Sequence, residues 1–255
     1  MKPLTPDQVE QFNEQGYVIV ENVLDDGTVD TLRAALDELE TRPEDDESVS
    51  RGGGHIVTVH GLPLQPGPLS RVLQFRPVLE IIEQLVAAPV QITGGVLLDK
   101  HPEHNWDIGW HSDNGIYVHT IPQGSPEDVR GGLPVYSTLE MEMARNVSCR
   151  IALDPAALDS GGLWVLPKSH LTNHGSDDED TKKQLAEQKG VLAAQTPGSA
   201  LCFRPLLLHR TEKMIASGRR RILHLQYGPN DLQLPGTETY HWPQPRPMTP
   251  IDDLI

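Results

Sequence analysis

The feature that most constrains the fold is a change in the spacing of apolar residues after Pro89. From there on, apolar residues come in short runs bounded by Gly or Pro, not at the spacing of a helix face. Short runs of this kind are typical of strands in a β-sandwich or β-barrel. We therefore predict a mainly β body, with strands at 90–98, 147–153, 162–166, 200–203 and 221–227.

The segment before Pro89 has a helical pattern instead. Val29, Leu32 and Leu36 recur every three or four residues, which predicts a helix with one buried face. Thr5 followed by Pro6 and Asp7 is a typical N-terminal cap. In all, helices are predicted near 5–16, 26–40 and 77–86, with one strand at 17–20.

The chain shows no internal repeat and no linker that would divide it. Its 255 residues fit one domain. We predict a single domain over 1–255, with flanking helices in a part that spans about 1–88, a barrel over 89–229 and a coil tail over 230–255. Within it we expect an exposed loop at 41–54 and a charged helical or mobile insertion at 176–189.

Charge and composition exclude several classes of partner. A net charge of −15 would repel nucleic acid and anionic membrane surfaces, and no apolar run is long enough to span a bilayer. Cys149 and Cys202 form no CxxC motif, which argues against a disulfide framework and a thiolate zinc site. We expect a cytoplasmic protein with a small-molecule partner and with neither nucleic acid nor membrane as partner.

The chemistry centres on His111-Ser112-Asp113. A His-x-Asp tripeptide is expected about once by chance in a chain with 11 histidines, so its context decides its value. On a strand, His111 and Asp113 would leave from the same face and could bind one cation. The competing His101-Pro102-Glu103 ranks lower, because Pro102 favours a loop.

His209 is the candidate third ligand. It ends the apolar run 206–208, which predicts a buried strand that delivers a histidine at its end. A lone histidine in such a place is more often a core residue than a metal ligand. The segment that follows, 219–227, favours the ligand role. Two histidines and a carboxylate would form the facial triad of non-haem iron oxygenases.

The following segment, 219–227, alternates like a strand. Arg220, His224 and Gln226 would share one face with Ile222, so one arginine at least points inward. A planar guanidinium is suited to hold a carboxylate, and the hydroxyl of Thr211 could add a hydrogen bond. Arg219 and Arg221 fit a solvated basic turn better.

These residues together give a family resemblance that covers most of the chain. The chain resembles the phytanoyl-CoA dioxygenase family of Fe(II)- and 2-oxoglutarate-dependent oxygenases. The matching segments are 12–23, the strand with Trp110-His111-Ser112-Asp113, the strand 151–154, the stretch from Gly161-Gly162-Leu163 to Ser169-His170, and His209 with Arg220.

The resemblance implies a double-stranded β-helix (jelly-roll, cupin-like) core packed by N-terminal helices. It implies that His111, Asp113 and His209 bind iron, and that Arg220, eleven positions after His209, holds the distal carboxylate of 2-oxoglutarate. The cofactors would be Fe(II), 2-oxoglutarate and O2. Thr211 falls where the family has a helper hydroxyl, and Lys100 matches a lysine expected to line the same cavity.

Two positions refine what the resemblance implies. Arg150 stands where many members have tryptophan, and it would bind an acidic group of the substrate or cosubstrate if it faced inward. An outward orientation is equally compatible with the sequence. Halogenating relatives have a small residue in place of the carboxylate, so Asp113 favours hydroxylation.

The function implied is oxidation, chiefly hydroxylation, of an unactivated C–H bond of a small metabolite, coupled to decarboxylation of 2-oxoglutarate to succinate and CO2. Secondary metabolism is the expected setting. Two alternatives remain open: a cupin-like non-oxidative metalloenzyme, such as an epimerase or isomerase, and a non-catalytic binding protein of the same fold. The first leaves Arg220 without a role.

Overall fold

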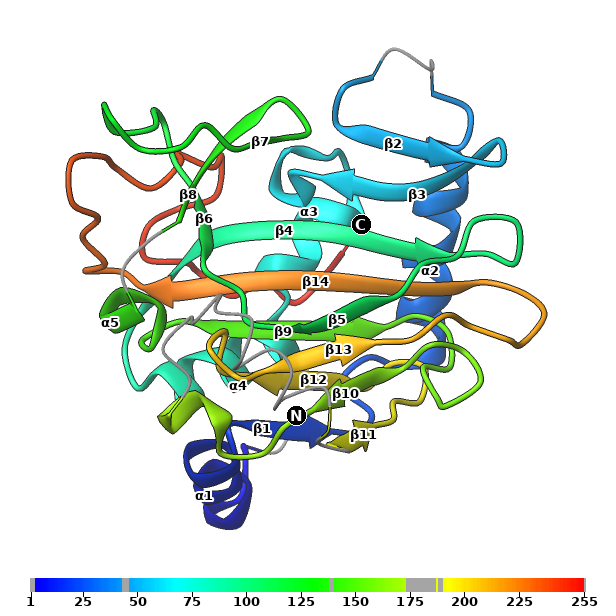
Figure 1. The fold of residues 1–255 in the computed structure, drawn as a ribbon, viewed down its shortest axis with the longest axis horizontal. Coiled ribbons are helices and arrows are strands. Elements are labelled where there is room, and N and C mark those ends of the chain that lie inside the picture. The colour runs from blue at the N-terminus through cyan, green and yellow to red at the C-terminus, as the bar shows by residue number, and fades with distance from the viewer. Residues whose placement is uncertain (1–2, 43–45, 138–139, 173–186, 188–189, 255) are drawn as a thin grey trace.

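The computed structural model of the chain is built around two facing β-sheets (Figure 1). It describes residues 3–42, 46–137, 140–172, 187 and 190–254. Neighbouring strands of the larger, seven-stranded sheet are antiparallel throughout. In spatial order they are β1 (Tyr17–Val20), β12 (Ala200–Phe203), β9 (Val147–Ala152), β14 (Arg220–Pro229), β4 (Val90–Lys100), β3 (His55–His60) and β2 (Val49–Gly52).

A four-stranded antiparallel sheet lies over the middle of the larger one (Figure 1). Side chains from both sheets line one cavity between them. The four strands are β11 (Val191–Ala193), β10 (Leu163–Val165), β13 (His209–Thr211) and β5 (Ile108–His111). A third sheet consists of β6 (Gly115–Tyr117), β8 (Leu133–Ser137) and β7 (Val129–Arg130).

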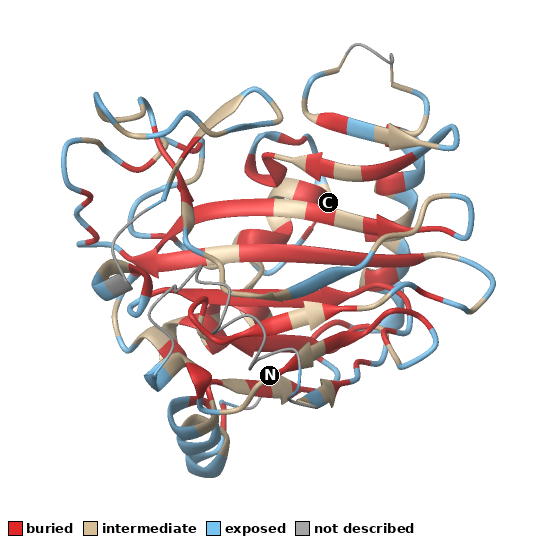
Figure 2. Cartoon of the chain, in the orientation of Figure 1, coloured by how far each residue is buried: buried red, intermediate tan, exposed pale blue. Residues whose placement is uncertain are grey.

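The alternation of β14 fixes which side chains reach the cavity. Arg220 and His224 line the cavity, whereas Leu223 and Leu225 join the hydrophobic core on the other face, as the sequence predicts. Both faces of this strand are covered, and almost all of its residues are buried (Figure 2). The strand therefore separates a polar interior from an apolar core.

Helices cover the outer face of the seven-stranded sheet. Val29, Leu32 and Leu36 of the second helix share one core with Leu223 and Leu225 of the sheet. The first helix has the predicted cap, a capping box on Thr5. The helices are α1 (Pro6–Gln15), α2 (Asp26–Leu39), α3 (Pro68–Arg71), α4 (Arg76–Val86) and α5 (Glu140–Met143), with 3-10 turns at Leu62–Leu64, Val72–Gln74 and Ser169–Leu171.

The prediction of an exposed loop over 41–54 is wrong in its second half. β2 and β3 form a hairpin, with Gly52 opposite His55. Gly53 and Gly54 have φ values of 60° and 83°, and positive φ at both central residues is what a type I′ hairpin turn requires. The N-terminal part is thus not only helical, because β1, β2 and β3 complete the seven-stranded sheet.

The last described residues are mostly irregular. Beyond β14 the described chain, to residue 254, has isolated bridges but no helix or strand element. The predicted charged insertion at 176–189 lies outside the described residues, except for residue 187. No helix in the described chain is both long and apolar enough to cross a membrane.

Candidate metal centre and cosubstrate cavity

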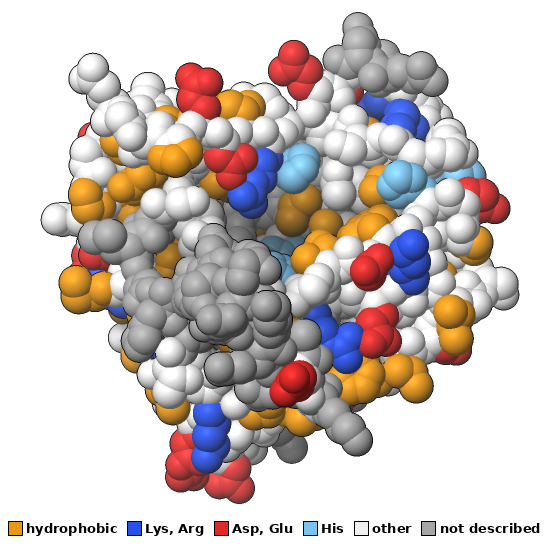
Figure 3. All heavy atoms as spheres, viewed as in Figure 1, with side chains coloured by type: hydrophobic (Ala, Val, Ile, Leu, Met, Phe, Trp, Pro, Cys, Tyr) orange, Lys and Arg blue, Asp and Glu red, His pale blue; other side chains and the backbone are white. Residues whose placement is uncertain are grey.

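The cavity between the two sheets has a volume of about 240 Å³. It opens as a hollow near the centre of the face in Figure 3, with histidine and arginine side chains beside apolar ones. All of the sequence-predicted site residues except Lys100 line it. A small enclosed space lined by apolar and a few polar groups is typical of a ligand site.

The structure brings His111, Asp113 and His209 together. β5 and β13 are paired with His111 opposite His209, and the two rings lie 4.2 Å apart. One potential ligand atom from each of the three residues lies within 4.8 Å of the others. His209 Nε2 is 3.7 Å from Asp113 Oδ1.

Asp113 does not lie on the strand as predicted. β5 ends at His111, and the backbone N–H of Asp113 donates a hydrogen bond to the Pro205 carbonyl, at 2.8 Å. This bond ties the segment after β5 to the loop before β13. The loop contact, and not a shared strand face, therefore sets the carboxylate between the two histidines.

Both histidines present the same ring nitrogen to the centre. His111 Nδ1 is 2.8 Å from the Gly109 carbonyl, and His209 Nδ1 is 2.8 Å from the Leu207 carbonyl. Because a carbonyl only accepts, each Nδ1 carries the proton and each Nε2 keeps a lone pair for a metal. Burial and the neighbouring His111 lower the pKa of His209 to about 3, so its imidazole is neutral.

A third histidine, on β14, lies beside the carboxylate. His224 Nε2 lies 3.6 Å from Asp113 Oδ2, an oxygen with no hydrogen bond within the described structure. Burial lowers the pKa of His224 to about 4. Burial also acts to raise the pKa of Asp113, but His209 and His224 hold that pKa below its usual range. The alternation of 219–227 placed His224 on this face but gave it no role.

Arg220 is almost completely buried, with 2% of its surface exposed, and it lines the cavity. Its Nε and Nη1 have no hydrogen-bond partner among the described residues. Burial, and then the charge of Arg150, lower its pKa to about 9. An unpaired buried guanidinium is costly, so this geometry fits a site for an anionic ligand.

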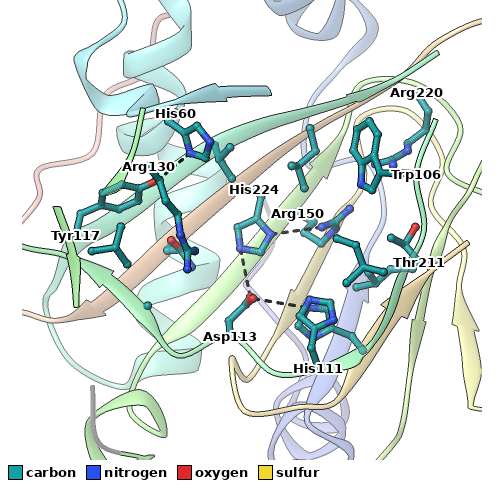
Figure 4. A pocket seen from close by; sticks show the side chains of 18 residues that line it. His60, Trp106, His111, Asp113, Tyr117, Arg130, Arg150, Thr211, Arg220 and His224 are labelled. Atoms are coloured by element: carbon teal, nitrogen blue, oxygen red, sulfur yellow. Dashed lines mark hydrogen bonds and ion pairs between the residues drawn. The ribbon is translucent and has the colours of Figure 1, made fainter. Parts of the chain in front are cut away.

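Thr211 and Arg220 line the same end of the cavity (Figure 4). Lys100 is not among the lining residues, but it contacts Thr211. The ammonium of Lys100 donates to Thr211 Oγ1 at 2.9 Å and to the Glu212 carbonyl at 2.6 Å. The Thr211 hydroxyl donates in turn to the Gly161 carbonyl. The expectation that Lys100 lines the cavity is therefore wrong, and Lys100 instead positions Thr211.

Arg150 faces inward, which decides a question that the sequence left open. It lines the cavity with 7% of its surface exposed, and its Nε has no hydrogen-bond partner among the described residues. Its nearest polar contact is His224 Nδ1, 3.5 Å from Nη1. Burial lowers its pKa to about 10, although the negative charge of Asp113 acts to raise it.

The two arginines beside Arg220 are engaged elsewhere. Arg221 makes a buried ion pair with Asp154, with Nε 2.8 Å from Oδ2. Arg219 Nη2 lies 2.6 Å from the buried carboxylate of Asp99. The prediction that both belong to a solvated basic turn is therefore wrong, because each closes an ion pair.

The other end of the cavity is lined by His60, Tyr117 and Arg130. His60 Nδ1 lies 3.1 Å from the Tyr117 hydroxyl (Figure 4). Arg130 pairs with Asp128, with Nη2 2.6 Å from Oδ2. Burial raises the pKa of Tyr117 to about 12 and lowers the pKa of His60. No local sequence pattern marks His60 or Arg130 as a cavity residue.

The competing histidine motif lies outside this cavity. His101 Nε2 is 3.3 Å from the Ile56 carbonyl and 3.5 Å from Asp99 Oδ1. It does not line the cavity, so the lower rank given to this pair agrees with the structure.

Comparison with known proteins gives the same architecture. The family model of phytanoyl-CoA dioxygenase (PhyH) matches residues 12–222. A search of curated proteins finds L-proline trans-4-hydroxylase of Streptomyces griseoviridis, 20% identical, with 85% of this chain and 84% of the relative covered. It also finds methylphosphonate hydroxylase of Gimesia maris, 23% identical, with 88% and 80% covered.

Among solved structures, EctD from S. alaskensis with 2-oxoglutarate and 5-hydroxyectoine aligns with a TM-score of 0.72. The identity is 20%, and the alignment covers 97% of this chain and 84% of that one. A likeness at this identity establishes the fold, so the predicted jelly-roll core with flanking helices is confirmed.

Proposed function

The chain belongs to the phytanoyl-CoA dioxygenase family of Fe(II)- and 2-oxoglutarate-dependent oxygenases, and we propose that it hydroxylates a small metabolite in the cavity between its two sheets. The hydroxylases among its curated relatives support this type of oxidation. Asp113 supports it further, since the carboxylate occupies the place that a halogenase needs to leave open. We also propose a single domain, a cytoplasmic location and a role in secondary metabolism.

One observation carries the proposal: one potential ligand atom from each of His111, Asp113 and His209 lies within 4.8 Å of the others, and both histidine Nδ1 atoms lie 2.8 Å from backbone carbonyls. His111, Asp113 and His209 would hold Fe(II) as a facial triad. The donor set fits a metal ion, because two imidazoles and a carboxylate bring several lone pairs to one point. When bound, iron with 2-oxoglutarate and O2 supplies the oxidant, and 2-oxoglutarate leaves as succinate and CO2.

The chain's own residues would orient the cosubstrate. Arg220 would hold the distal carboxylate of 2-oxoglutarate through Nε and Nη1, which have no hydrogen-bond partner among the described residues. Thr211 would set the edge of that site, and Lys100 would keep Thr211 in place through the hydrogen bond between Nζ and Oγ1. The metabolite would then bind on the side of His60, Tyr117 and Arg130 (Figure 4).

Anaerobic titration with Fe(II) and 2-oxoglutarate tests this function. We expect the weak visible charge-transfer band of an iron-bound 2-oxoacid to appear only when both are present. The His111→Ala variant serves as the control, since it should fold without giving the band. A well-folded wild-type protein without the band would contradict the proposal.

A further inference from the structure

The cavity has an excess of buried positive charge. Arg150 and Arg220 are 7% and 2% exposed, and both line it. Among the described residues that line the cavity, Asp113 is the single carboxylate. Arg130 also lines the cavity, but Asp128 neutralises it at 2.6 Å.

Loading the site does not remove this excess. Two guanidiniums against one carboxylate leave one positive charge, and the two charges of Fe(II) cancel the two of 2-oxoglutarate. Arginine cannot lose its proton at physiological pH, so the charge cannot be relieved by titration. Lys100, which contacts Thr211, adds to the excess whenever it is protonated.

An unpaired charge in a buried site loses much of its hydration free energy. Few contacts with the described residues offset this cost for Arg150. Its Nε has no hydrogen-bond partner within the described structure, and its closest polar neighbour, His224 Nδ1, lies at the limit of a hydrogen bond, 3.5 Å from Nη1. Asp113 attracts Arg150, but that carboxylate is the one that would bind iron.

Arg150 is distinct from the arginine assigned to the cosubstrate. In Figure 4 the Arg150 guanidinium lies beside His224, whereas Arg220 lies at the end with Trp106. Because Arg220 would hold the distal carboxylate of 2-oxoglutarate, Arg150 remains for a second anion in the same cavity.

We propose that the metabolite is a small organic anion with one net negative charge, and that Arg150 binds its carboxylate or other oxyanion group. This inference rests on the proposed function, because it places the metabolite in the loaded cavity. The volume of about 240 Å³, shared with 2-oxoglutarate, keeps the molecule small. His60, Tyr117 and Arg130 would contact its uncharged part.

Calorimetric titration of the anaerobic protein loaded with Fe(II) and 2-oxoglutarate tests this without requiring turnover. The probes are straight-chain carboxylates, each paired with its neutral amide of the same shape, and short alkylphosphonates. We expect at least one oxyanion series to bind saturably, with an affinity at least about tenfold above that of its neutral match. Carboxylate or phosphonate preference then identifies the type of oxyanion.

Three variants locate the anion. Arg150→Gln should abolish the preference for oxyanions while 2-oxoglutarate still binds, and Arg150→Lys should retain the preference with weaker binding. Arg130→Gln tests the other arginine that lines the cavity. Because Arg130 already has Asp128 as its carboxylate partner, this variant should keep the preference for oxyanions even if the overall affinity changes. Circular dichroism checks that each variant is folded.

Several results would overturn the inference. These are equal binding of oxyanion and neutral probes, no saturable binding of any oxyanion, or loss of the preference in Arg130→Gln but not in Arg150→Gln. If Arg150→Gln weakened 2-oxoglutarate as strongly as Arg220→Gln does, Arg150 would be a cosubstrate residue instead. Each of these results is distinct from failure of the proposed function, in which the charge-transfer band itself would be absent.

Discussion

His224 on β14 lies close to Asp113, which follows β5. Nε2 of His224 is 3.6 Å from Oδ2 of the carboxylate, and Nε2 of His209 is 3.7 Å from Oδ1. Each carboxylate oxygen thus has its own imidazole neighbour. With Oδ1 turned to the metal, Oδ2 would be held by a residue that is not itself a ligand. Such contacts to ligand residues tune metal affinity in many proteins.

We predict that His224→Leu lowers the affinity for Fe(II) about 10- to 100-fold, because Asp113 loses the group that orients it. His224→Gln keeps a side-chain donor and should restore part of the affinity. Competition with a chelator measures both under anaerobic conditions. Gln226→Leu, two residues further along the same strand face, is the control and should leave Fe(II) affinity unchanged. Equal affinities in wild type and His224→Leu would refute the role of His224.

The triad itself gives a second prediction. His111→Ala, Asp113→Ala and His209→Ala should each abolish Fe(II)-dependent succinate formation, because each removes one of three ligands to the same ion. His101→Ala is the matched control, since His101 lies outside the cavity and should leave succinate formation intact. Succinate released from 2-oxoglutarate is the quantity to measure, and full activity in any of the three variants would remove that residue from the ligand set.

A third prediction concerns the cosubstrate. Arg220→Gln should raise the KM for 2-oxoglutarate by roughly 10- to 100-fold with a smaller change in kcat, because a charge-assisted bond to the distal carboxylate is lost. Arg219→Gln, on the neighbouring position but paired with Asp99, should leave that KM unchanged. If the Arg220 variant kept the wild-type KM, another cation would hold the carboxylate.

Local patterns predicted what depends on local structure. The alternation of 219–227 placed Arg220 and His224 on the cavity face, and the spacing of Leu32 and Leu36 gave the buried face of α2. The structure also brings together the three predicted ligand residues, His111, Asp113 and His209. Periodicity is sufficient for such features, because one strand or helix fixes where its side chains point.

Features set by contacts between distant segments could not be predicted in this way. Asp113 is held by a hydrogen bond to Pro205, which lies in another loop, and not by the strand that the tripeptide suggested. Arg221 looked solvated because its partner, Asp154, lies 67 positions earlier. The hairpin at Gly53 and Gly54 was a missed local signal, since two glycines in succession favour a type I′ turn.

The buried ion pair of Asp154 with Arg221 gives a prediction about stability. The Asp154 side chain is 11% exposed. Its carboxylate lies 2.8 Å from Arg221 Nε and 3.2 Å from Arg33 Nη2. Asp154→Ala would leave Arg221 buried without this partner, so we expect the free energy of unfolding to fall by about 3–5 kcal/mol at neutral pH. Asp30→Ala removes an exposed partner of Arg33 and should cost about 1 kcal/mol or less, which urea unfolding can distinguish.

The same ion pair should make stability depend on pH in the acid range. Burial opposes ionisation of Asp154, but the hydrogen bond and charge of Arg221 hold its pKa below the usual value in the folded protein. The unfolded chain then takes up the proton first, so this contribution is complete above about pH 4 and is lost as pH falls through the lower, folded pKa. Urea unfolding should be measured from neutral pH down through this range. The free energy of unfolding should then fall less on acidification in Asp154→Ala than in wild type. Parallel curves for the two proteins would show that Asp154 does not contribute to acid sensitivity, whatever its effect at neutral pH.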